Sequence, residues 1–395
     1  MDGLSGDFGA AIVGTGFMGW VHAEALARIG VPVVSVLGTT VAKAERLAQR
    51  SGLAGRCRIH ATLDEVLSDP SVSVVHLAVP NRWHFDFSKR ALLAGKHVMC
   101  EKPLAMTAAE SAELVRLADA HPRLVAGVNY NIRFYPLCRE MRDRVQSGEL
   151  GDVLHVCGSY SQDWLLHNTD YNWRVLSGEG GELRAMSDIG THWLDLAQEI
   201  TGLNVESLCA DLTTVHPIRY RPEGEIETFQ GSAHQNQRRS GVPITTDDYG
   251  CLLLRFEGGA RGVVWASQVM AGHKNQLRLE IAGSKRSLAW NSESPDQLWM
   301  GRRDEPNELL SRDPSLLGRA GRLASDYPGG HVEGYADSFK QCFRAFYGYL
   351  AAGDFAAPRP FATFADGHRE IMLCEAILRS HQSGSWVAVA DEAAH

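Results

Sequence analysis

The sequence predicts an α/β protein that begins with a doubly wound parallel sheet and continues into an α+β domain with a large, mostly antiparallel open sheet. Two observations lead to this fold class. Up to residue 130, short apolar runs alternate with segments of helical pattern, which is typical of parallel sheets. From Val205 onward most segments have the pattern of strands and are separated by turns such as Glu257-Gly258-Gly259. We therefore predict one domain over residues 1–130 and a second over residues 131–395.

The composition excludes several classes of protein. A length of 395 residues allows two domains with separate cores, and a net charge of −8 without a basic tract argues against a nucleic-acid partner. No apolar run reaches the length that spans a membrane, so we expect no membrane partner. The eight cysteines show neither CxxC nor metal-ligand spacing, so we expect no metal site. The first residues lack the basic region of a signal peptide, which predicts a cytoplasmic location.

The first strand–helix junction carries a glycine pattern typical of dinucleotide sites. The apolar run Phe8–Val13 is followed by Gly14-Thr15-Gly16-Phe17-Met18-Gly19, and a helical stretch continues from Trp20. In such a turn the first glycine permits the tight bend, the second lets a pyrophosphate approach the backbone, and the third lets the helix pack on the strand. The N–H groups at the start of the helix would face the phosphates. A glycine turn without a ligand is the alternative.

The end of the second strand, Val33–Leu37, bears on the choice between NAD and NADP. An NAD site commonly has an acidic residue here to hold the ribose hydroxyls, and none is present. Thr39, Thr40 and Lys43 could receive a 2′-phosphate, which favours NADP, but hydroxyls also tolerate NAD. Alternatively, Thr40 serves only as the N-cap of the next helix. The predicted cofactor is therefore NAD(P), with the preference open.

The later strands of this domain end at further polar residues. Pro80 ends the third predicted strand, Asn81 is a candidate cap for the helix that starts near His84, and His84 is either an exposed residue of that helix or a cofactor contact. Asn129 ends the fifth predicted strand, which begins at Leu124. Right-handed crossovers bring the strand ends to one edge of the sheet, and this edge is predicted to hold Gly14, Thr39, Pro80, Lys102 and Asn129.

The apolar run Val98–Cys100 leads directly into Glu101-Lys102-Pro103. A charged pair at the carboxyl end of a buried parallel strand lies where open α/β sheets bind their ligands. A lysine acts as an acid or base when burial and nearby positive charge bring its pKa towards the working pH. Taken alone, a surface Lys-Pro turn is the simpler interpretation. The glycine pattern upstream favours a catalytic one.

The second predicted domain contributes an acid and an imidazole. Ser187 is a candidate cap of a helix in which Asp188 and His192, four residues apart, share one face. Histidine exchanges protons with little change of its ordinary pKa. A first-turn acid favoured by the helix dipole and a core histidine are the structural alternatives. A site that uses these residues together with Lys102 would lie between the two domains.

The glycine pattern, Glu101-Lys102-Pro103 and Asp188-x-Gly190-x-His192 together resemble the glucose–fructose oxidoreductase/inositol dehydrogenase/rhizopine catabolism (Gfo/Idh/MocA) family over nearly the whole chain. The resemblance implies a Rossmann domain, a nicotinamide cofactor, a sugar, polyol or glycoside substrate, and an open sheet used for contacts in a homodimer or homotetramer. It also implies that Lys102 is catalytic and precedes a cis proline, that His192 accepts the proton, and that Asp188 positions a hydroxyl. Trp173-Arg174 resembles a pair that lies near the nicotinamide.

Besides the catalytic residues Lys102, His192 and Asp188, we predict contacts to the cofactor and contacts to the substrate. The predicted cofactor contacts are Gly14, Gly16, Phe17, Met18, Gly19, Thr39, Thr40, Lys43, Pro80, Asn81, His84, Glu101, Lys102, Asn129, Trp173 and Arg174. Aromatic and planar polar groups recognise sugars, so the predicted substrate contacts are Lys102, Arg133, Tyr160, Gln162, Trp164, Asn172, Asp188, His192 and Tyr335. The stretch from Gln162 to Arg174 could instead be a packed Ω-loop.

Three functions compete at this point. The first is an NAD(P)-dependent dehydrogenase that acts on a sugar, polyol or glycoside, with Lys102 and His192 as acid/base groups. The second is a glycosidase that uses NAD transiently, cleaving a glycoside by oxidation, elimination, hydration and re-reduction; an anionic substrate would be served by Arg133, Arg174, His167 and His331. The third is a redox sensor that binds a dinucleotide without chemistry. Accumulation of NAD(P)H from a simple sugar distinguishes the first from the second.

Overall fold

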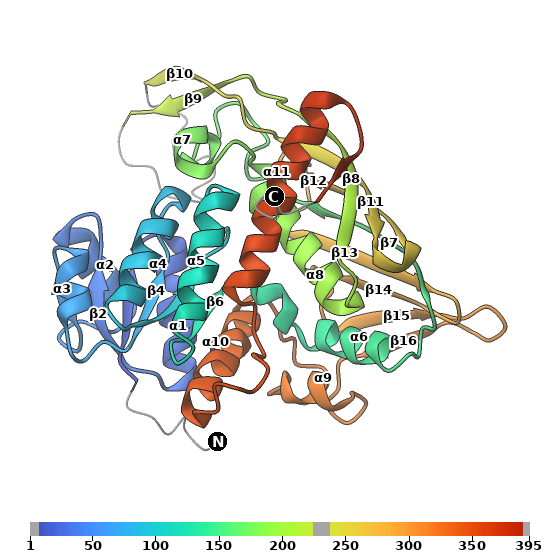
Figure 1. Ribbon diagram of the computed structural model, residues 1–395, viewed down its shortest axis with the longest axis horizontal. Coiled ribbons are helices and arrows are strands. Elements are labelled where there is room, and N and C mark those ends of the chain that lie inside the picture. The colour runs from blue at the N-terminus through green and yellow to red at the C-terminus, as the bar shows by residue number, and fades with distance from the viewer. Residues whose placement is uncertain (1–7, 224–237, 390–395) are drawn as a thin grey trace. The chain divides into compact units, whose positions relative to one another are not determined.

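A computed structural model describes residues 8–223 and 238–389 (Figure 1). The chain splits into two compact units. The first unit runs to Asn131 and also contains Phe339–Ile371, whereas the second contains Ile132–Ser338 and the residues from Met372 onward. The first unit therefore draws on two stretches that are far apart in the sequence.

The first unit is built on a six-stranded parallel sheet with the order β3-β2-β1-β4-β5-β6. Its strands are β1 (Ala10–Val13), β2 (Val33–Leu37), β3 (Arg58–His60), β4 (Val74–Leu77), β5 (His97–Cys100) and β6 (Ala126–Val128). This topology confirms the predicted doubly wound sheet. The sequence predicted five strands, and β3 was missed because this three-residue edge strand has no apolar run.

Different helices cover the two faces of this sheet. The helices before residue 131 are α1 (Phe17–Ile29), α2 (Val41–Arg50), α3 (Leu63–Ser68), α4 (His84–Leu93) and α5 (Ala108–Ala120). Leu63, Leu92 and Leu114 of α3, α4 and α5 join one core with Val75 and Val98. The opposite face meets α1 and the late helix α10 (Tyr335–Ala352), because His22 contacts His76 and a side chain at Gly127 would touch Phe346. Residues 339–352 therefore complete a core that the N-terminal segment begins.

The second unit contains a nine-stranded sheet with the order β16-β15-β14-β13-β7-β12-β11-β8-β17, and only β7 and β12 pair in parallel. The predicted large, mostly antiparallel sheet is confirmed. Its strands are β7 (Val153–Ser161), β8 (Val205–Thr213), β11 (Tyr249–Phe256), β12 (Arg261–Ser267), β13 (Gln276–Gly283), β14 (Ser287–Asn291), β15 (Gln297–Gly301), β16 (Glu308–Ser311) and β17 (Val387–Ala388). Separately, β9 (Ile218–Pro222) pairs in antiparallel fashion with β10 (Arg239–Pro243). The helices of this unit are α6 (Pro136–Gln146), α7 (Ser177–Gly180), α8 (Thr191–Thr201), α9 (Arg319–Leu323) and α11 (Phe364–Ser383). Helix α11 belongs partly to the first unit, because the division between the units falls within it.

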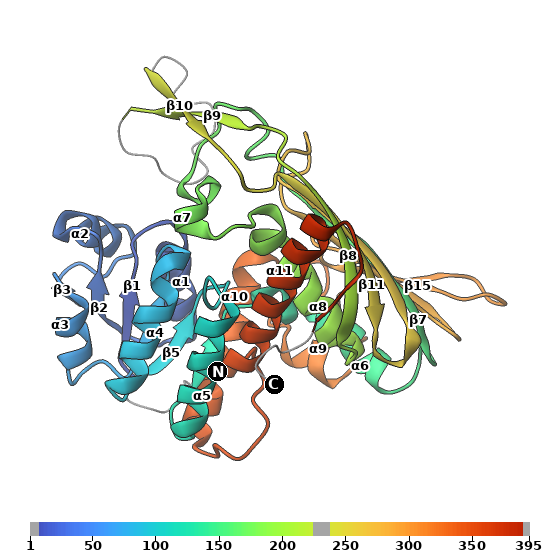
Figure 2. The same ribbon diagram turned by 45° about the horizontal axis from the view of Figure 1, so that its top comes forward.

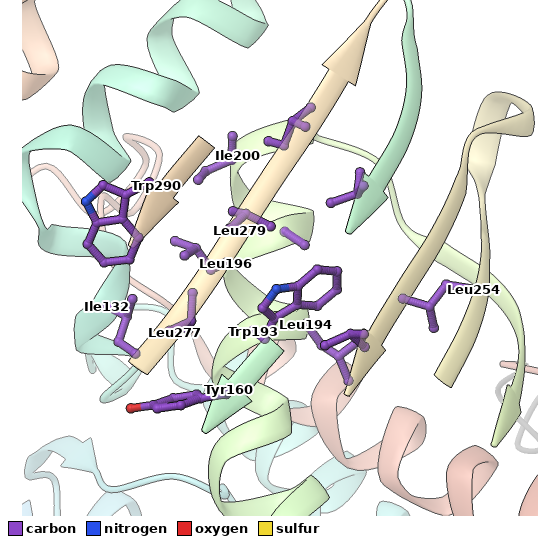
Figure 3. Packing of buried hydrophobic residues seen from close by; sticks show 14 of the residues in the cluster. Ile132, Tyr160, Trp193, Leu194, Leu196, Ile200, Leu254, Leu277, Leu279 and Trp290 are labelled. Carbon is purple, nitrogen blue, oxygen red and sulfur yellow. The ribbon is translucent and has the colours of Figure 1, made fainter. Parts of the chain in front are cut away.

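The helices α6 and α8 and the C-terminal part of α11 pack on one face of the sheet (Figure 2). Figure 3 shows Trp193 and Leu196 of α8 against Leu277 and Leu279 of β13. The indole N–H of Trp193 donates to the carbonyl of Arg278 at 2.9 Å, so its one polar group is satisfied in the core. Each large apolar side chain buried in this way contributes about 1.5–3 kcal/mol. This core holds α8, and with it the start of that helix, against the sheet.

Protonation of His97 is expected to destabilise the first unit in acid. Its Nδ1 accepts a hydrogen bond from Val125 N at 2.9 Å, and burial lowers its pKa from 6.5 to about 4. Between these values the unfolded chain binds more protons than the folded chain, so stability falls as the pH falls from 6.5 towards 4, by roughly 3 kcal/mol at most. Urea denaturation against pH checks this: His97→Asn keeps an acceptor but cannot titrate, so the slope should decrease in this window. An unchanged slope would contradict the prediction.

Candidate active site

The turn between β1 and α1 has the geometry that its three glycines predict. Gly14 has a φ of 113°, and a Cβ there would lie 2.1 Å from the carbonyl oxygen of Ala78. A Cβ at Gly19 would lie 2.0 Å from the carbonyl oxygen of Gly14, whereas one at Gly16 would meet no atom within 4 Å. Gly16 is therefore open on the side from which a pyrophosphate would approach, and no side chain caps α1. These features fit a dinucleotide.

The residues after β2 form the start of α2. The hydroxyl of Thr40 accepts from Lys43 N at 3.3 Å, so the alternative that Thr40 is an N-cap is confirmed. Thr39 and Thr40 are exposed and Lys43 is half-buried. A cap that uses the Thr40 hydroxyl in this way leaves Thr39 and Lys43 as the better candidates for a ribose or phosphate contact.

The predictions for Asn81 and His84 need correction. Asn81 begins a 3₁₀ turn (Asn81–Trp83), and the N-cap position of α4 is occupied by Trp83. His84 is buried, with Nδ1 2.6 Å from the carbonyl oxygen of Pro103 and Nε2 2.9 Å from that of Val79. Burial lowers the pKa of His84 against the effect of these two acceptors, so a neutral ring donates to one of them at a time. His84 is therefore not exposed, and because both of its ring nitrogens face carbonyls of the protein, we do not retain it as a candidate cofactor contact.

Glu101 is held at the carboxyl end of β5. Its Oε1 accepts from His22 Nε2 at 2.9 Å and from Asn129 Nδ2 at 2.5 Å. Burial alone would raise the pKa of Glu101, but the hydrogen bonds from His22 and Asn129 and the charge of Lys102 lower it below its usual value. The carboxylate is therefore ionised next to Lys102. The peptide bond between Lys102 and Pro103 is cis, as the resemblance implied.

In the second unit, three predicted substrate contacts form one polar group at the end of β7. Tyr160 OH and Gln162 Nε2 each donate to Asn275 Oδ1 at 2.8 Å. The indole N–H of Trp164 donates to Gln162 Oε1, also at 2.8 Å. Asn275, which sequence reasoning missed, immediately precedes β13, and β13 pairs with β7 at Gln276 and Ser161. Asn275 can therefore be identified as part of this group from the pairing of β13 with the end of β7.

Asp188 and His192 lie in one continuous helical stretch. Residues Met186–Gly190 form a π-helix that leads into α8. Ser187 is inside this stretch and its hydroxyl donates to Leu183 O at 2.7 Å, so the prediction that Ser187 caps the helix is wrong. The imidazole of His192 packs near Tyr160, with ring centroids 6.2 Å apart. Burial, followed by the charge of Asp188, raises the pKa of Tyr160, so that its phenol stays protonated beside them.

Gln268 orients the Asp188 carboxylate. Its Nε2 donates to Asp188 Oδ2 at 2.8 Å, while its Oε1 faces Arg184 Nη1 at 3.4 Å. Because Arg184 can only donate, the amide of Gln268 has one orientation. Sequence reasoning missed Gln268. It follows β12, and the parallel pairing of β7 with β12 brings the ends of both strands to one edge.

Arg174 also lies near the Asp188 carboxylate. The Nε of Arg174 lies 3.6 Å from Asp188 Oδ1, and the guanidinium stacks 4.5 Å from the ring centroid of Trp173. Asn172 is buried, and its Oδ1 accepts from Arg174 N at 3.2 Å and from Arg174 Nη1 at 3.3 Å. Trp173 and Arg174 therefore belong to the same group as Asp188.

Two other predicted substrate contacts have different surroundings. Arg133 is buried and donates to Asp195 through Nε at 2.8 Å and through Nη2, and to Glu199 through Nη1 at 3.1 Å. This pairing accounts for its burial, so the prediction that Arg133 binds the substrate is not retained. Tyr335 is 37% exposed at the first position of α10.

Across residues 8–223 and 238–389 no group of three or more His, Cys, Asp or Glu side chains could hold a metal ion. In the same residues, no helix combines the length and hydropathy that crossing a bilayer requires.

Known proteins resemble the chain over nearly its whole length. Levoglucosan dehydrogenase of Pseudarthrobacter phenanthrenivorans is 29% identical over 390 residues, which cover 96% of this chain and 97% of the relative. A solved oxidoreductase domain protein from Kribbella flavida is 28% identical with a TM-score of 0.85, covering 97% of this chain and 99% of its own. A solved levoglucosan dehydrogenase in complex with NADH and levoglucosan is 26% identical, with the same TM-score of 0.85 and the same coverage of 97% and 99%.

Two family models match successive stretches of the chain. A model described as an oxidoreductase family with an NAD-binding Rossmann fold matches residues 8–130. A model of the GFO/IDH/MocA C-terminal domain matches residues 138–289. The glycine turn lies within the first match, and Asp188, His192 and Gln268 lie within the second. The chain therefore belongs to the Gfo/Idh/MocA family of oxidoreductases and carries that family's NAD-binding Rossmann domain.

Proposed function

We propose that this protein is an NAD(P)-dependent dehydrogenase that moves a hydride between the nicotinamide and a hydroxyl-bearing carbon of a sugar, polyol or glycoside. The observation that carries the proposal is the group around Asp188. Its carboxylate is oriented by Gln268 and faces Arg174, and Tyr160 lies near His192. An ionised acceptor, an imidazole and aromatic rings are the groups that bind sugar hydroxyls and remove a proton from one. The likeness to a levoglucosan dehydrogenase supports this substrate class.

Each catalytic residue has a proposed role. His192 takes the proton of the reacting hydroxyl, and Asp188 accepts a hydrogen bond that orients the sugar. Lys102, next to the ionised Glu101, donates a hydrogen bond to the reacting oxygen and stabilises negative charge that develops there. The nicotinamide supplies the hydride acceptor. These roles place proton transfer on the protein and hydride transfer on the cofactor.

The proposed binding residues follow from the same groups. For the cofactor we retain Gly14, Gly16, Phe17, Met18, Gly19, Thr39, Thr40, Lys43, Pro80, Asn81, Glu101, Lys102, Asn129, Trp173 and Arg174. For the sugar we retain Lys102, Tyr160, Gln162, Trp164, Asn172, Asp188, His192 and Tyr335. The Trp164 ring offers an apolar face, and the polar groups around Gln162 are already held in fixed orientations by Asn275.

A turnover screen tests the proposed function. The purified full-length chain is incubated with NAD or NADP and a panel of sugars, polyols, acidic sugars and p-nitrophenyl glycosides. Accumulation of reduced nicotinamide with at least one simple sugar or polyol is expected. Release of p-nitrophenol with catalytic NAD and no net reduction would replace the proposal by the NAD-dependent glycosidase. Binding of NAD without turnover of any class would contradict both.

Thr40→Asp is expected to shift the cofactor preference towards NAD. Aspartate is a good N-cap, so α2 keeps the hydrogen bond that Lys43 N now makes with Thr40. The new carboxylate would accept from ribose hydroxyls and repel a 2′-phosphate. We expect the ratio of kcat/KM for NAD to that for NADP to rise roughly tenfold, which corresponds to about 1.4 kcal/mol. An unchanged ratio would show that this turn does not contact the ribose.

Gln268→Leu is expected to lower kcat/KM roughly ten- to a hundredfold. The substitution removes the hydrogen bond that orients Asp188, and it also removes the Gln268 oxygen that accepts from Arg184 Nη1. Gln297→Leu, at an exposed position of β15, serves as the matched control. Steady-state kinetics with thermal unfolding separate the two effects. Equal kinetics for both variants would show that Gln268 does not orient Asp188.

We further propose that the open face of the nine-stranded sheet joins copies of the chain in a homodimer or homotetramer. On this face Leu253 is 51% exposed and Val263, opposite it in the ladder, is 44% exposed. The row continues through Cys157 on β7 and Cys209 on β8. An apolar row of this kind is typical of a surface that is covered by a partner. Sedimentation equilibrium should give a dimer or tetramer for the natural chain and a smaller species for Val263→Glu; a monomeric natural chain would exclude the proposal.

A further inference from the structure

A buried chain of polar side chains crosses the first unit and ends at Glu101. Tyr347 OH lies 2.9 Å from His76 Nε2, His76 Nδ1 lies 3.1 Å from His22 Nδ1, and His22 Nε2 lies 2.9 Å from Glu101 Oε1. His22, His76 and Tyr347 are fully buried. The ring centroid of Phe343 lies 4.8 Å from the ring centroids of both imidazoles. These side chains come from α1, from β4, from the residue that follows β5, and from α10.

The positions of the protons follow from the acceptor at one end. An ionised carboxylate can only accept, so His22 must donate through Nε2. In neutral His22 the Nδ1 is then an acceptor, and His76 has to donate to it through its own Nδ1. That leaves His76 Nε2 as an acceptor for Tyr347 OH. With both rings neutral, the chain therefore has a single direction, from Tyr347 through His76 and His22 to Glu101.

The environment of each group agrees with this arrangement. Burial lowers the pKa of His76 well below its usual value, which keeps its ring neutral. Burial raises the pKa of Tyr347 well above its usual value, which keeps its phenol a donor. The pKa of Glu101 is lowered, as described above, so the acceptor at the end of the chain stays ionised. If His22 carried one extra proton, its Nδ1 would donate to His76 Nδ1 and His76 Nε2 would donate to Tyr347 OH. These two hydrogen bonds would then run in the opposite direction.

We propose that Tyr347, His76 and His22 are positioning residues that hold the Glu101 carboxylate in one orientation and thereby place the peptide that carries Lys102. The inference rests on the proposed function, in which Lys102 contacts the reacting oxygen. Asn129 donates to the same Oε1 as His22, so both hydrogen bonds constrain one oxygen of Glu101. The backbone N–H of Glu101 is bound to Leu77 O at 2.9 Å. Lys102 is the next residue in the sequence, so the orientation of Glu101 determines where the side chain of Lys102 begins.

The position of the hydrogen-bonded side chains Tyr347, His76 and His22 argues for a role beyond packing. His76 lies on a sheet face that is otherwise covered by Phe343, Phe346 and other apolar groups. Burying polar groups costs free energy unless each is hydrogen-bonded, and apolar side chains of similar volume are commonly as stable or more so. A leucine at position 76 would pack there without this requirement. The chain is therefore expected to affect catalysis more than stability.

Imidazole nitrogen NMR tests the proton positions without reference to any reaction. The full-length chain is labelled with [¹⁵N]histidine, and the signals of His22 and His76 are identified by their loss in His22→Gln and His76→Gln. We expect His22 as the Nε2–H tautomer and His76 as the Nδ1–H tautomer. A neutral His76 with its proton on Nε2 would overturn the proposed direction. Because this readout needs no substrate, it is informative even if the screen for sugar oxidation fails.

Kinetics of matched variants test the effect on Lys102. Tyr347→Phe removes the first donor, and kcat should fall roughly tenfold while the dissociation constant for NAD stays the same. Tyr349→Phe is the control, because it removes a hydroxyl of the same helix that donates to Ala357 O at 3.2 Å. His76→Leu should lower kcat further. His76→Asn places an N–H near the position of Nδ1 and should restore most of the loss.

Two results would overturn the positioning role. One is an equal kcat for Tyr347→Phe and Tyr349→Phe. The other is a fall in stability and NAD affinity in His76→Leu that His76→Asn does not relieve, because it would indicate a purely structural contribution. Turnover of sugars by the natural chain with unaffected variants would reject this inference and keep the proposed function.

Discussion

Lys102→Met is expected to lower kcat by roughly 10³-fold or more while cofactor binding is preserved. Methionine keeps the length of the side chain but removes the ammonium group, and with it both the hydrogen bond to the reacting oxygen and the charge that stabilises that oxygen. Glu101 also loses the neighbouring positive charge that helps to lower its pKa. Single-turnover reduction of NAD(P) and isothermal titration with the cofactor measure the two consequences separately.

The control for Lys102 is Lys89→Met. Lys89 is a lysine of the same unit that is 39% exposed and pairs with Glu113 at 2.6 Å. Its replacement should change neither turnover nor cofactor affinity measurably, since exposed pairs contribute little. Activity of Lys102→Met close to that of the Lys89 variant would refute the proposed mechanism. A parallel loss of cofactor binding would move Lys102 from catalysis to binding.

His192→Gln is expected to lower kcat roughly 10²- to 10⁴-fold, the range over which general acid–base groups act. Glutamine keeps a polar planar group near Tyr160 but cannot accept a proton at neutral pH. If His192 is the base, the acid limb of the pH–rate profile disappears in His192→Gln and persists in the residual activity of Lys102→Met. If Lys102 is the base, the acid limb disappears in Lys102→Met and persists in the residual activity of His192→Gln. The comparison decides which of the two residues takes the proton.

His381→Gln serves as the control for His192. His381 is a histidine of the same unit whose side chain is 39% exposed, and its substitution should leave the profile unchanged. Measurement of kcat over a range of pH, with the solvent isotope effect at the optimum, identifies the proton-transfer step. A pH profile for His192→Gln that matches that of the natural chain would exclude His192 as the acid/base group.

Much of the first unit was predictable because its signals are local. The strand Val33–Leu37 and the glycine turn depend on neighbouring residues: an apolar run, then small residues where the backbone bends or touches another segment. The same holds for Tyr249–Phe256, whose alternating burial is visible in the sequence. Local patterns failed where an element was short, as in β3, and where a helix start depended on geometry, as at Ser187.

The partners of the polar residues were decided only by the tertiary structure. His76 and Tyr347 are 271 positions apart and His22 and Glu101 are 79 apart, so no local pattern connects them. Gln268 reaches Asp188 because β7 and β12 pair in parallel.

The sequence by itself determined the fold class, the family, the glycine turn and the position of Lys102 after a buried strand, because each depends on the order of nearby residues. Only the tertiary structure decided which buried polar groups share a hydrogen bond. Arg133 pairs with Asp195 and Glu199, and the ring nitrogens of His84 lie within hydrogen-bonding distance of the carbonyls of Val79 and Pro103. The physical reason is that a buried polar group must find a partner, and the packing of distant segments determines which partner is within reach.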